Sequence, residues 1–160
     1  MSAFEFPMRV PYHEVDAQGV VFKAWYLAWF DEAMTEFLES RSLTYRAMLD
    51  AGYDVQLVRA ELDWHAGVGW GEDVVVAVST ARIGRTGFAL DFQVRALDDA
   101  GNRIVTCDCR NGYLVVAADG GGEQEVPTLI RNALTPVSGF RGPGRDVHSR
   151  AADAPPHLAE

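Results

Sequence analysis

Apolar and polar residues alternate from Phe4 to Tyr12 near the start of the chain. Because successive side chains of a β-strand point to opposite faces, this alternation predicts a strand with one buried face. Pro7 and Pro11 fall on the other face, and a proline cannot donate a hydrogen bond to a neighbouring strand. We therefore expect an edge strand or an irregular pairing over these residues.

The spacing of apolar residues changes at Lys23 or Ala24 to that of an α-helix. The helical stripe consists of Tyr26, Leu27, Phe30, Ala33, Met34, Phe37 and Leu38. Such a broad stripe is typical of a helix that a sheet wraps around. We expect this helix to end near Ser40, and a second, short helix over 44–51 to stop at Gly52.

Four strand patterns fill most of the remaining sequence, over 53–65, 73–83, 88–97 and 103–116. Glycine-containing turns at 84–87 and 98–102 separate the last three strands, and a short helix is expected before Leu134. One long helix followed by consecutive antiparallel strands predicts an α+β domain in which a single curved sheet buries the helix. The exposed edges of such a sheet favour pairing with a second copy of the chain.

The composition is that of an ordinary globular domain, with 160 residues of which 48% are hydrophobic and 23% charged. The formal net charge of −9 argues against a nucleic-acid partner, because phosphates need a broad basic face. No leader pattern or bilayer-spanning apolar run occurs, so we expect a cytoplasmic protein with no membrane partner. We place the folded domain over 1–137 and expect the aperiodic segment 138–160 to be a mobile or disordered tail.

Cys107 and Cys109 are the two cysteines, and they lie two residues apart in a predicted strand. Side chains at that spacing point the same way, and a disulfide between them would strain the backbone. No second pair of metal ligands lies near them in the sequence. We interpret both as reduced thiols and expect neither a metal nor a redox cofactor.

Asp16 is the candidate for chemistry, because it lies between the first strand and the long helix, close to Gly19. The N–H groups that begin a helix carry positive potential and can stabilise an oxyanion. A carboxylate beside them can attack a substrate or remove a proton. The structural alternative is an Asx turn, in which the Asp16 side chain accepts hydrogen bonds from the following N–H groups.

The segment 10–38, and YHEVDAQGVVFKAWYLAWFDEA within it, resembles the 4-hydroxybenzoyl-CoA thioesterase-like branch of the hotdog-fold superfamily. That family shows a strand ending in Tyr-x-Glu-Thr/Val-Asp, a glycine turn, two apolar residues, an aromatic residue and a helix like Tyr-Leu-x-Trp-Phe-Glu-Glu-Ala. The matching residues are Tyr12, Glu14, Asp16, Gly19, Val20, Val21, Phe22, Tyr26, Leu27, Trp29, Phe30 and Ala33.

The resemblance implies a hotdog fold and hydrolysis of an acyl-CoA, an aryl-CoA or another pantetheine-linked thioester. Asp16 matches the catalytic aspartate, as nucleophile or as general base for water, and the backbone N–H groups of Lys23 and Ala24 match the oxyanion site. The resemblance also implies active sites between two subunits, and hence a homodimer or homotetramer. Many relatives have His or Tyr in place of Lys23 and Asn in place of Trp25. The backbone donors are unaffected by these differences. Lys23 departs from the side chain that relatives have at that position, and Trp25 would narrow the pocket that Asn leaves open in them.

Arg82, Arg85 and Thr86 lie in or beside the predicted turn at 84–87. Exposed N–H and guanidinium groups at such a turn can hold phosphates, so these residues are candidates for binding CoA. A solvated hairpin end is the structural alternative. The remaining substrate-binding candidates are Gly19, Trp25 and, more weakly and for phosphate, Lys23 and Arg59.

Other functions stay open on these residues. Glu32 and Glu36 lie on the predicted helix, from which another hotdog strategy supplies its catalytic acid, although their spacing fits a solvated face better. His13 and His65 have no nucleophile in a recognisable motif, so no catalytic triad is predicted. A hotdog hydratase or dehydratase would need one of these histidines. A non-catalytic acyl-CoA-binding protein would keep the arginines and tolerate the loss of Asp16.

Overall fold

The structure is a computed structural model, and it describes residues 3–140. Residues 141–160, most of the predicted tail, lie outside the described residues. The elements in chain order are β1 (Phe4–Arg9), the 3-10 helix η1 (Tyr12–Glu14), α1 (Lys23–Ser40), α2 (Tyr45–Asp50), β2 (Tyr53–Trp64), β3 (Asp73–Ile83), β4 (Gly87–Leu97), β5 (Arg103–Ala117) and α3 (Thr128–Leu134).

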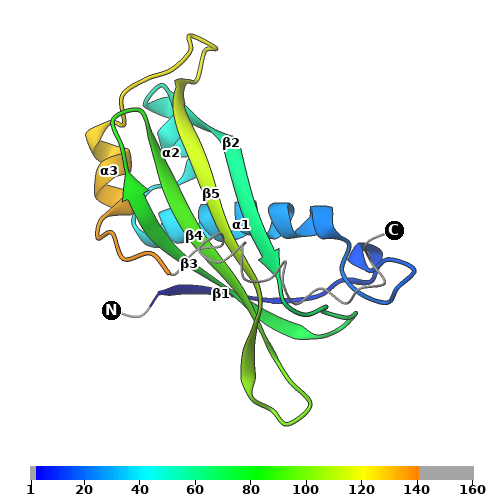
Figure 1. Cartoon of the computed structure of the whole chain (residues 1–160). Helices are drawn as coiled ribbons and strands as arrows, with labels where there is room; N and C mark the ends of the chain where they lie inside the picture. Colours follow the sequence, from blue (N-terminus) through cyan, green and yellow to red (C-terminus); the bar gives the residue numbers. More distant parts are fainter. Residues whose placement is uncertain (1–2, 141–160) are drawn as a thin grey trace, which may run out of the picture.

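The strands form one antiparallel sheet in the order β1-β3-β4-β5-β2, and the sheet curves around α1 (Figure 1). This is the predicted α+β hotdog arrangement. β1 lies at one edge, where Pro7 faces Val75 and has no second neighbouring strand. β2 forms the other edge.

The core lies between α1 and the concave face of the sheet. The buried residues of α1 are Tyr26, Trp29, Phe30, Ala33, Phe37 and Leu38. Phe30 packs on Phe92 of β4 with the ring centroids 4.8 Å apart. Cys107 and Cys109 lie on the same concave face, buried and unbonded to each other, as their spacing predicted.

The first strand is shorter than the alternation predicted. β1 ends at Arg9, and Tyr12 lies in η1 with 73% of its surface exposed, so its assignment to the buried face was wrong. Pro11 precedes η1 with φ −77°, a value that starts a helical turn readily but removes a strand N–H donor. The turn of η1 redirects the chain so that Glu14, and not Tyr12, is buried.

Three bulges interrupt the regular register of the sheet. One lies between Leu57 and Arg59 in β2, one between Thr80 and Arg82 in β3, and one in β5 opposite the step from Val94 to Arg95. Each inserts an extra residue into its strand and shifts the side chains that follow. After the bulges, Arg82, Ala89, Gly112 and Arg59 form one row across β3, β4, β5 and β2. This row lies on the outer face of the sheet, the face away from α1, because it alternates with residues of the core.

The last described residues, 138–140, pack against β3. Both Ser138 and Gly139 donate their backbone N–H to the carbonyl of Thr80. The predicted boundary between domain and tail at 137/138 stays a prediction. Within residues 3–140, no helix is both long and apolar enough to cross a membrane.

Candidate active site

The Asp16 loop is a small hairpin that leads directly into α1. Val15 pairs with Val21 in an antiparallel bridge, and the Asp16 N–H donates to the Val20 carbonyl at 2.9 Å. The Gly19 N–H closes the turn on the Asp16 carbonyl at 3.0 Å. Gly19 has φ +79°, a left-handed conformation that favours glycine. Its place in the structure is therefore that of a turn residue, and its substrate-binding role stays a prediction.

The Asp16 side chain is half-buried and makes an Asx turn. Its Oδ1 accepts a hydrogen bond from the Gln18 backbone N–H at 2.8 Å. Its Oδ2 has no donor among residues 3–140. The structural role considered for Asp16 is thus present, and it leaves one carboxylate oxygen available for chemistry.

The start of α1 is uncapped. Phe22 occupies the position before the helix and offers no side-chain hydrogen bond, and the first turn contains no acidic residue. Within the described part of the chain, the backbone N–H groups of Lys23 and Ala24 have no acceptor, and both residues are exposed. Unpaired donors at the positive end of an 18-residue helix can stabilise a negative charge.

Glu14 is a buried acid that the sequence interpretation used only as part of a motif. It is 8% exposed, and its Oε2 accepts a 2.7 Å hydrogen bond from the indole Nε1–H of Trp29 on α1. The sequence contained a signal for its burial. The apolar residues of the first alternating pattern fall at even positions, and Glu14 is the next even position. An acidic residue at a position where the alternation predicts a buried side chain needs a hydrogen-bond partner in the interior.

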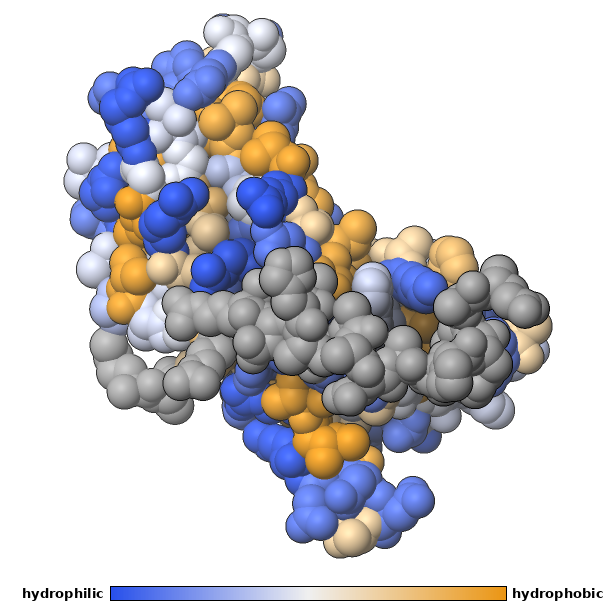
Figure 2. Space-filling model, in the orientation of Figure 1, coloured by the Kyte–Doolittle hydropathy of each residue, from blue (hydrophilic) through white to orange (hydrophobic). Residues whose placement is uncertain are grey.

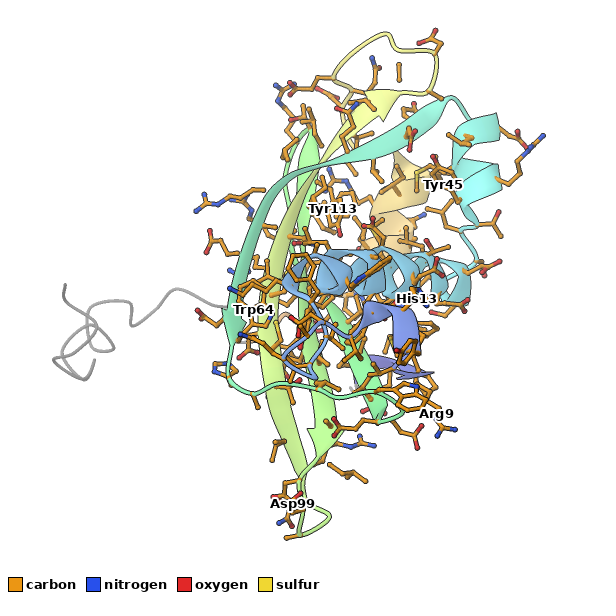
Figure 3. All side chains as sticks on the ribbon, turned by 90° about the vertical axis from the view of Figure 1, so that its right-hand side faces the viewer. Arg9, His13, Tyr45, Trp64, Asp99 and Tyr113 are labelled. Atoms are coloured by element: carbon orange, nitrogen blue, oxygen red, sulfur yellow. The ribbon has the colours of Figure 1, made fainter. Side chains whose placement is uncertain are left out.

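Aromatic residues flank the helix start on both sides. Figure 3 looks onto this end of α1, with His13 on one side and Trp64 of β2 on the other. His13 packs edge-on against Trp25 at 5.4 Å, and Trp64 packs edge-on against Tyr26 at 6.0 Å. Burial raises the pKa of the Tyr26 hydroxyl to about 12. Trp64, which is 42% exposed, is a second site-lining candidate that sequence reasoning did not single out.

The loop between β2 and β3 packs against the Asp16 hairpin. The Val21 N–H donates to the Val68 carbonyl at 2.8 Å. A Cβ at Gly67 would lie 2.6 Å from Cγ1 of Val20, so a larger residue at this point would displace the Val20 side chain of the hairpin. The position of Asp16 therefore depends on a close approach by a distant part of the chain.

The arginine candidates gather on the outer face at the opposite end of the sheet. Arg59, Arg82, Arg85 and Thr86 line a groove of about 400 Å³ whose floor includes Gly112. Arg59 forms an ion pair with Glu61, and Arg85 lies 3.3 Å from Glu125. Arg82 has no ion-pair partner within residues 3–140.

Asp16 and the arginine groove are not brought together within one chain. The Asp16 hairpin contacts the loop that precedes β3, whereas Arg82 lies near the end of β3. Asp73, the first residue of β3, and Arg82 are nine residues apart, which corresponds to about 30 Å at roughly 3.3 Å per residue. A thioester bound at Asp16 would reach this chain's groove only by spanning the length of the sheet.

The other titratable candidates lie outside the Asp16 site. Glu32 and Glu36 are exposed on α1, as expected for a solvated face. His65 lies 2.8 Å from Asp108 on the outer face of the sheet. Burial raises the pKa of the Cys107 thiol to about 12, so this sulfur stays protonated at neutral pH. Residues 3–140 contain no cluster of His, Cys, Asp or Glu side chains that could hold a metal ion.

A family comparison agrees with the fold. Residues 10–160 match the model of the thioesterase-like superfamily. The chain therefore belongs to this superfamily, and it is a thioester hydrolase of the acyl-CoA thioesterase type.

Individual relatives give the same assignment. A protein of Aquifex aeolicus (strain VF5), provisionally described as an esterase, is 31% identical over 114 residues, which are 70% of this chain and 89% of that protein. The acyl-CoA thioesterase YbgC of Haemophilus influenzae is 43% identical over 49 residues, which are 31% of this chain and 36% of that protein. The crystal structure of a 4-hydroxybenzoyl-CoA thioesterase has the same fold, with a TM-score of 0.77 over 84% of this chain and all of that one, at 14% identity.

Proposed function

We propose that this protein hydrolyses an acyl-CoA, an aryl-CoA or another pantetheine-linked thioester through Asp16. The observation that carries the proposal is the hairpin that places a half-buried carboxylate beside the uncapped start of α1. The N–H groups of Lys23 and Ala24 are the proposed oxyanion donors, a contribution typically of about 3–4 kcal/mol per donor.

Two routes lead from this geometry to the same products. Asp16 either attacks the thioester carbon to form a mixed anhydride that water then cleaves, or it removes a proton from a water molecule that attacks. In both, the carbon–sulfur bond breaks, and the free acid and thiol form. Because a thiolate is a good leaving group, neither route needs a strong general acid.

The site is complete only when two chains meet along β2. This edge strand exposes Leu57 and Val58, and hydrophobic residues gather on the side of the molecule where β2 lies (Figure 2). Antiparallel pairing of two β2 strands about a twofold axis would set the Trp64 end of one beside the Tyr53 end of the other. The Asp16 end of one chain would then face the arginine end of its partner. This is the proposed homodimer, and a homotetramer would add a second such pair.

The arginine groove is the proposed phosphate site. Arg82 and Arg85, with Thr86 beside them, would hold phosphates of CoA from the partner chain while the thioester lies at Asp16. Because the chain has a formal net charge of −9, a local group of arginines stands out as a candidate site for a negatively charged ligand. The groove is open to solvent, so the nucleotide part of CoA could lie in it on the surface of the protein.

The aromatic surroundings favour the 4-hydroxybenzoyl-CoA thioesterase-like branch of the superfamily. Trp25 lies in the first turn of α1, and Trp64 packs on Tyr26 of the same turn, so both offer flat apolar rings to an acyl or aryl group. Solved structures with this fold include enzymes named for gentisyl-CoA and 1,4-dihydroxy-2-naphthoyl-CoA. An aromatic acyl group is thus the first substrate class to test.

A thioester hydrolase that uses Glu32 or Glu36 on α1 in place of Asp16 is the second candidate. The Asx turn favours it, since Asp16 has a structural task through its Oδ1 that does not require catalysis. The two candidates differ in whether the negative charge of Asp16 takes part in the reaction. An asparagine at this position removes the charge but keeps the oxygen that accepts the turn hydrogen bond, so it separates the two.

The test is thiol release from a panel of short, long and aromatic acyl-CoAs, with Asp16→Asn beside the wild type. We expect turnover to fall by about 10²–10⁴-fold in Asp16→Asn, with KM little changed, because the base or nucleophile is lost while the turn survives. The matched control is Asp98→Asn, since Asp98 makes the same Asx turn to the Ala100 N–H in the β4–β5 hairpin. Turnover that survives in Asp16→Asn would favour the second candidate.

A further inference from the structure

Glu14 is a buried acidic residue, and the burial of a carboxylate costs free energy of hydration. A carboxylate removed from water loses several kcal/mol of hydration unless hydrogen bonds replace it, and an apolar pair often serves stability equally well. Here the Trp29 indole N–H is a single neutral donor at 2.7 Å, and the His13 Nε2 lies 3.9 Å away. Stability alone therefore gives little reason for an acid in this place.

Glu14 is connected to both parts of the proposed site. Its backbone carbonyl accepts the Phe22 N–H at 2.9 Å, which closes the base of the Asp16 hairpin immediately before α1. Its side chain reaches Trp29, further along α1. The neighbouring His13 packs on Trp25, which lies four residues before Trp29 and so on the same side of the helix.

We propose that Glu14 and Trp29 form a positioning pair that fixes the Asp16 hairpin on α1. This inference rests on the proposed function. The hairpin carries the carboxylate and α1 carries the N–H donors, so their separation is set by whatever holds the hairpin on the helix. Glu14 bonds to the hairpin through its main chain and to α1 through its side chain.

The expected consequence is a loss of rate without a loss of substrate binding. A misplacement of about 1 Å in a catalytic constellation can cost about 10²-fold in rate. Glu14→Ala and Trp29→Phe should each lower kcat by about 10–100-fold and change KM less than about threefold. Glu14→Gln keeps an oxygen acceptor for the indole N–H, so its kcat should stay within about threefold of the wild-type value.

A matched control separates positioning from general destabilisation. Thr80→Val removes another buried hydrogen bond, from Thr80 Oγ1 to the Leu134 carbonyl at 2.6 Å, at the other end of the sheet. It should lower the melting temperature but leave kcat unchanged when assayed well below that temperature. An equal fall of kcat in Thr80→Val and Glu14→Ala would overturn the inference.

The hydrogen bond also has a readout independent of activity. In the wild type, the Trp29 indole proton should exchange slowly with solvent in NMR spectra, and in Glu14→Ala it should exchange at least about tenfold faster. The double variant Glu14→Ala/Trp29→Phe should be no slower in kcat than the worse single variant, because the two residues act as one unit. Equal indole exchange in the wild type and Glu14→Ala would overturn the pairing.

Asp16→Asn, assayed in parallel, distinguishes the two levels of the proposal. A collapse of kcat in Asp16→Asn together with a normal kcat in Glu14→Ala would overturn the positioning pair alone. Full turnover in Asp16→Asn, or none in the wild type, would overturn the proposed function and the inference with it.

Discussion

The two ends of the sheet are built in different ways. At the Asp16 end, the hairpin and the start of α1 are consecutive in sequence, and hydrogen bonds between near neighbours hold them. At the other end, Arg59 comes from β2, whereas Arg82 and Arg85 come from the end of β3 and the turn after it, and Arg59 and Arg82 reach the groove through strand bulges. Local sequence therefore forms the first arrangement, which the distant loop at Gly67 and Val68 then supports, and the register of the whole sheet determines the second.

The difference suggests a division of labour. The Asp16 end is closely packed, with a glycine in contact with the hairpin and a buried acid behind it. Reaction chemistry needs such fixed geometry. The arginine groove is open and its side chains are long and exposed, which suits the electrostatic binding of a mobile nucleotide.

Among changes to the surroundings of the two ends, the largest effect should come from crowding the hairpin at the Asp16 end. Gly67→Ala would put a Cβ 2.6 Å from Val20 Cγ1, so the hairpin must shift. We expect kcat to fall by about 10–100-fold and the free energy of unfolding to fall by about 1–3 kcal/mol. Steady-state kinetics and urea titration measure both.

The double variant Gly67→Ala/Val20→Ala is the control, because it removes the clashing methyl groups. It should recover most of the lost kcat. If kcat in Gly67→Ala equals that of the wild type, the position of the hairpin does not limit the reaction.

A smaller and different effect should follow at the arginine end. Arg82→Gln and Arg85→Gln should each raise KM for an acyl-CoA by about tenfold, since a charge-assisted hydrogen bond contributes about 1.5–3 kcal/mol. Turnover at saturation should be unchanged. An acyl thioester of N-acetylcysteamine, which has no phosphates, should show no change in either variant.

Arg46→Gln is the control for loss of an exposed arginine, because the ion pair that Arg46 makes within residues 3–140 is with Asp50 on the surface of α2. Its KM should match that of the wild type. An equal KM increase for the phosphate-free thioester would show that the arginines act on something other than CoA phosphates.

The smallest effect is on the pH dependence of stability, through the buried residues Tyr26 and Cys107. Burial raises the pKa of Tyr26 from 10.0 to about 12 and that of Cys107 from 9.0 to about 12. The unfolded chain therefore releases these protons first, and the stability that the protonated groups contribute is lost as pH rises from about 9 to about 12. Each group contributes at most about 1.4 kcal/mol per pH unit. Tyr26→Phe should reduce the fall in melting temperature between pH 10 and pH 11; an unaltered fall would contradict a buried Tyr26 hydroxyl.

Much of the fold was predictable because its signals are local. The helix start at Lys23, the stop at Gly52 with φ +95°, and the span of β3 follow from periodicity and glycine positions. The end of β1 was not predicted, because the alternation continues through Tyr12 while Pro11 turns the backbone. The pattern records which residues are apolar, but it does not record where the chain bends.

The candidate site was predictable at one end and only in outline at the other. Asp16 and its turn could be read from neighbouring residues, and the structure places them beside the helix start. Glu14 and Trp29 are 15 residues apart, and their contact depends on the packing of η1 on α1. The grouping of Arg59 with Arg82 depends on two bulges that no local sequence signal marks.

The central claim is that the two ends function together across a pair of chains, and a mixed dimer tests it directly. One chain carries Asp16→Asn and the other carries Arg82→Glu with Arg85→Glu, each with its own affinity tag, so that mixed dimers can be isolated. If each site uses Asp16 from one chain and the arginines from its partner, one of the two sites in a mixed dimer is wholly wild type. The account predicts about half of the wild-type kcat/KM for an acyl-CoA. A value equal to the mean of the two parent variants would contradict it.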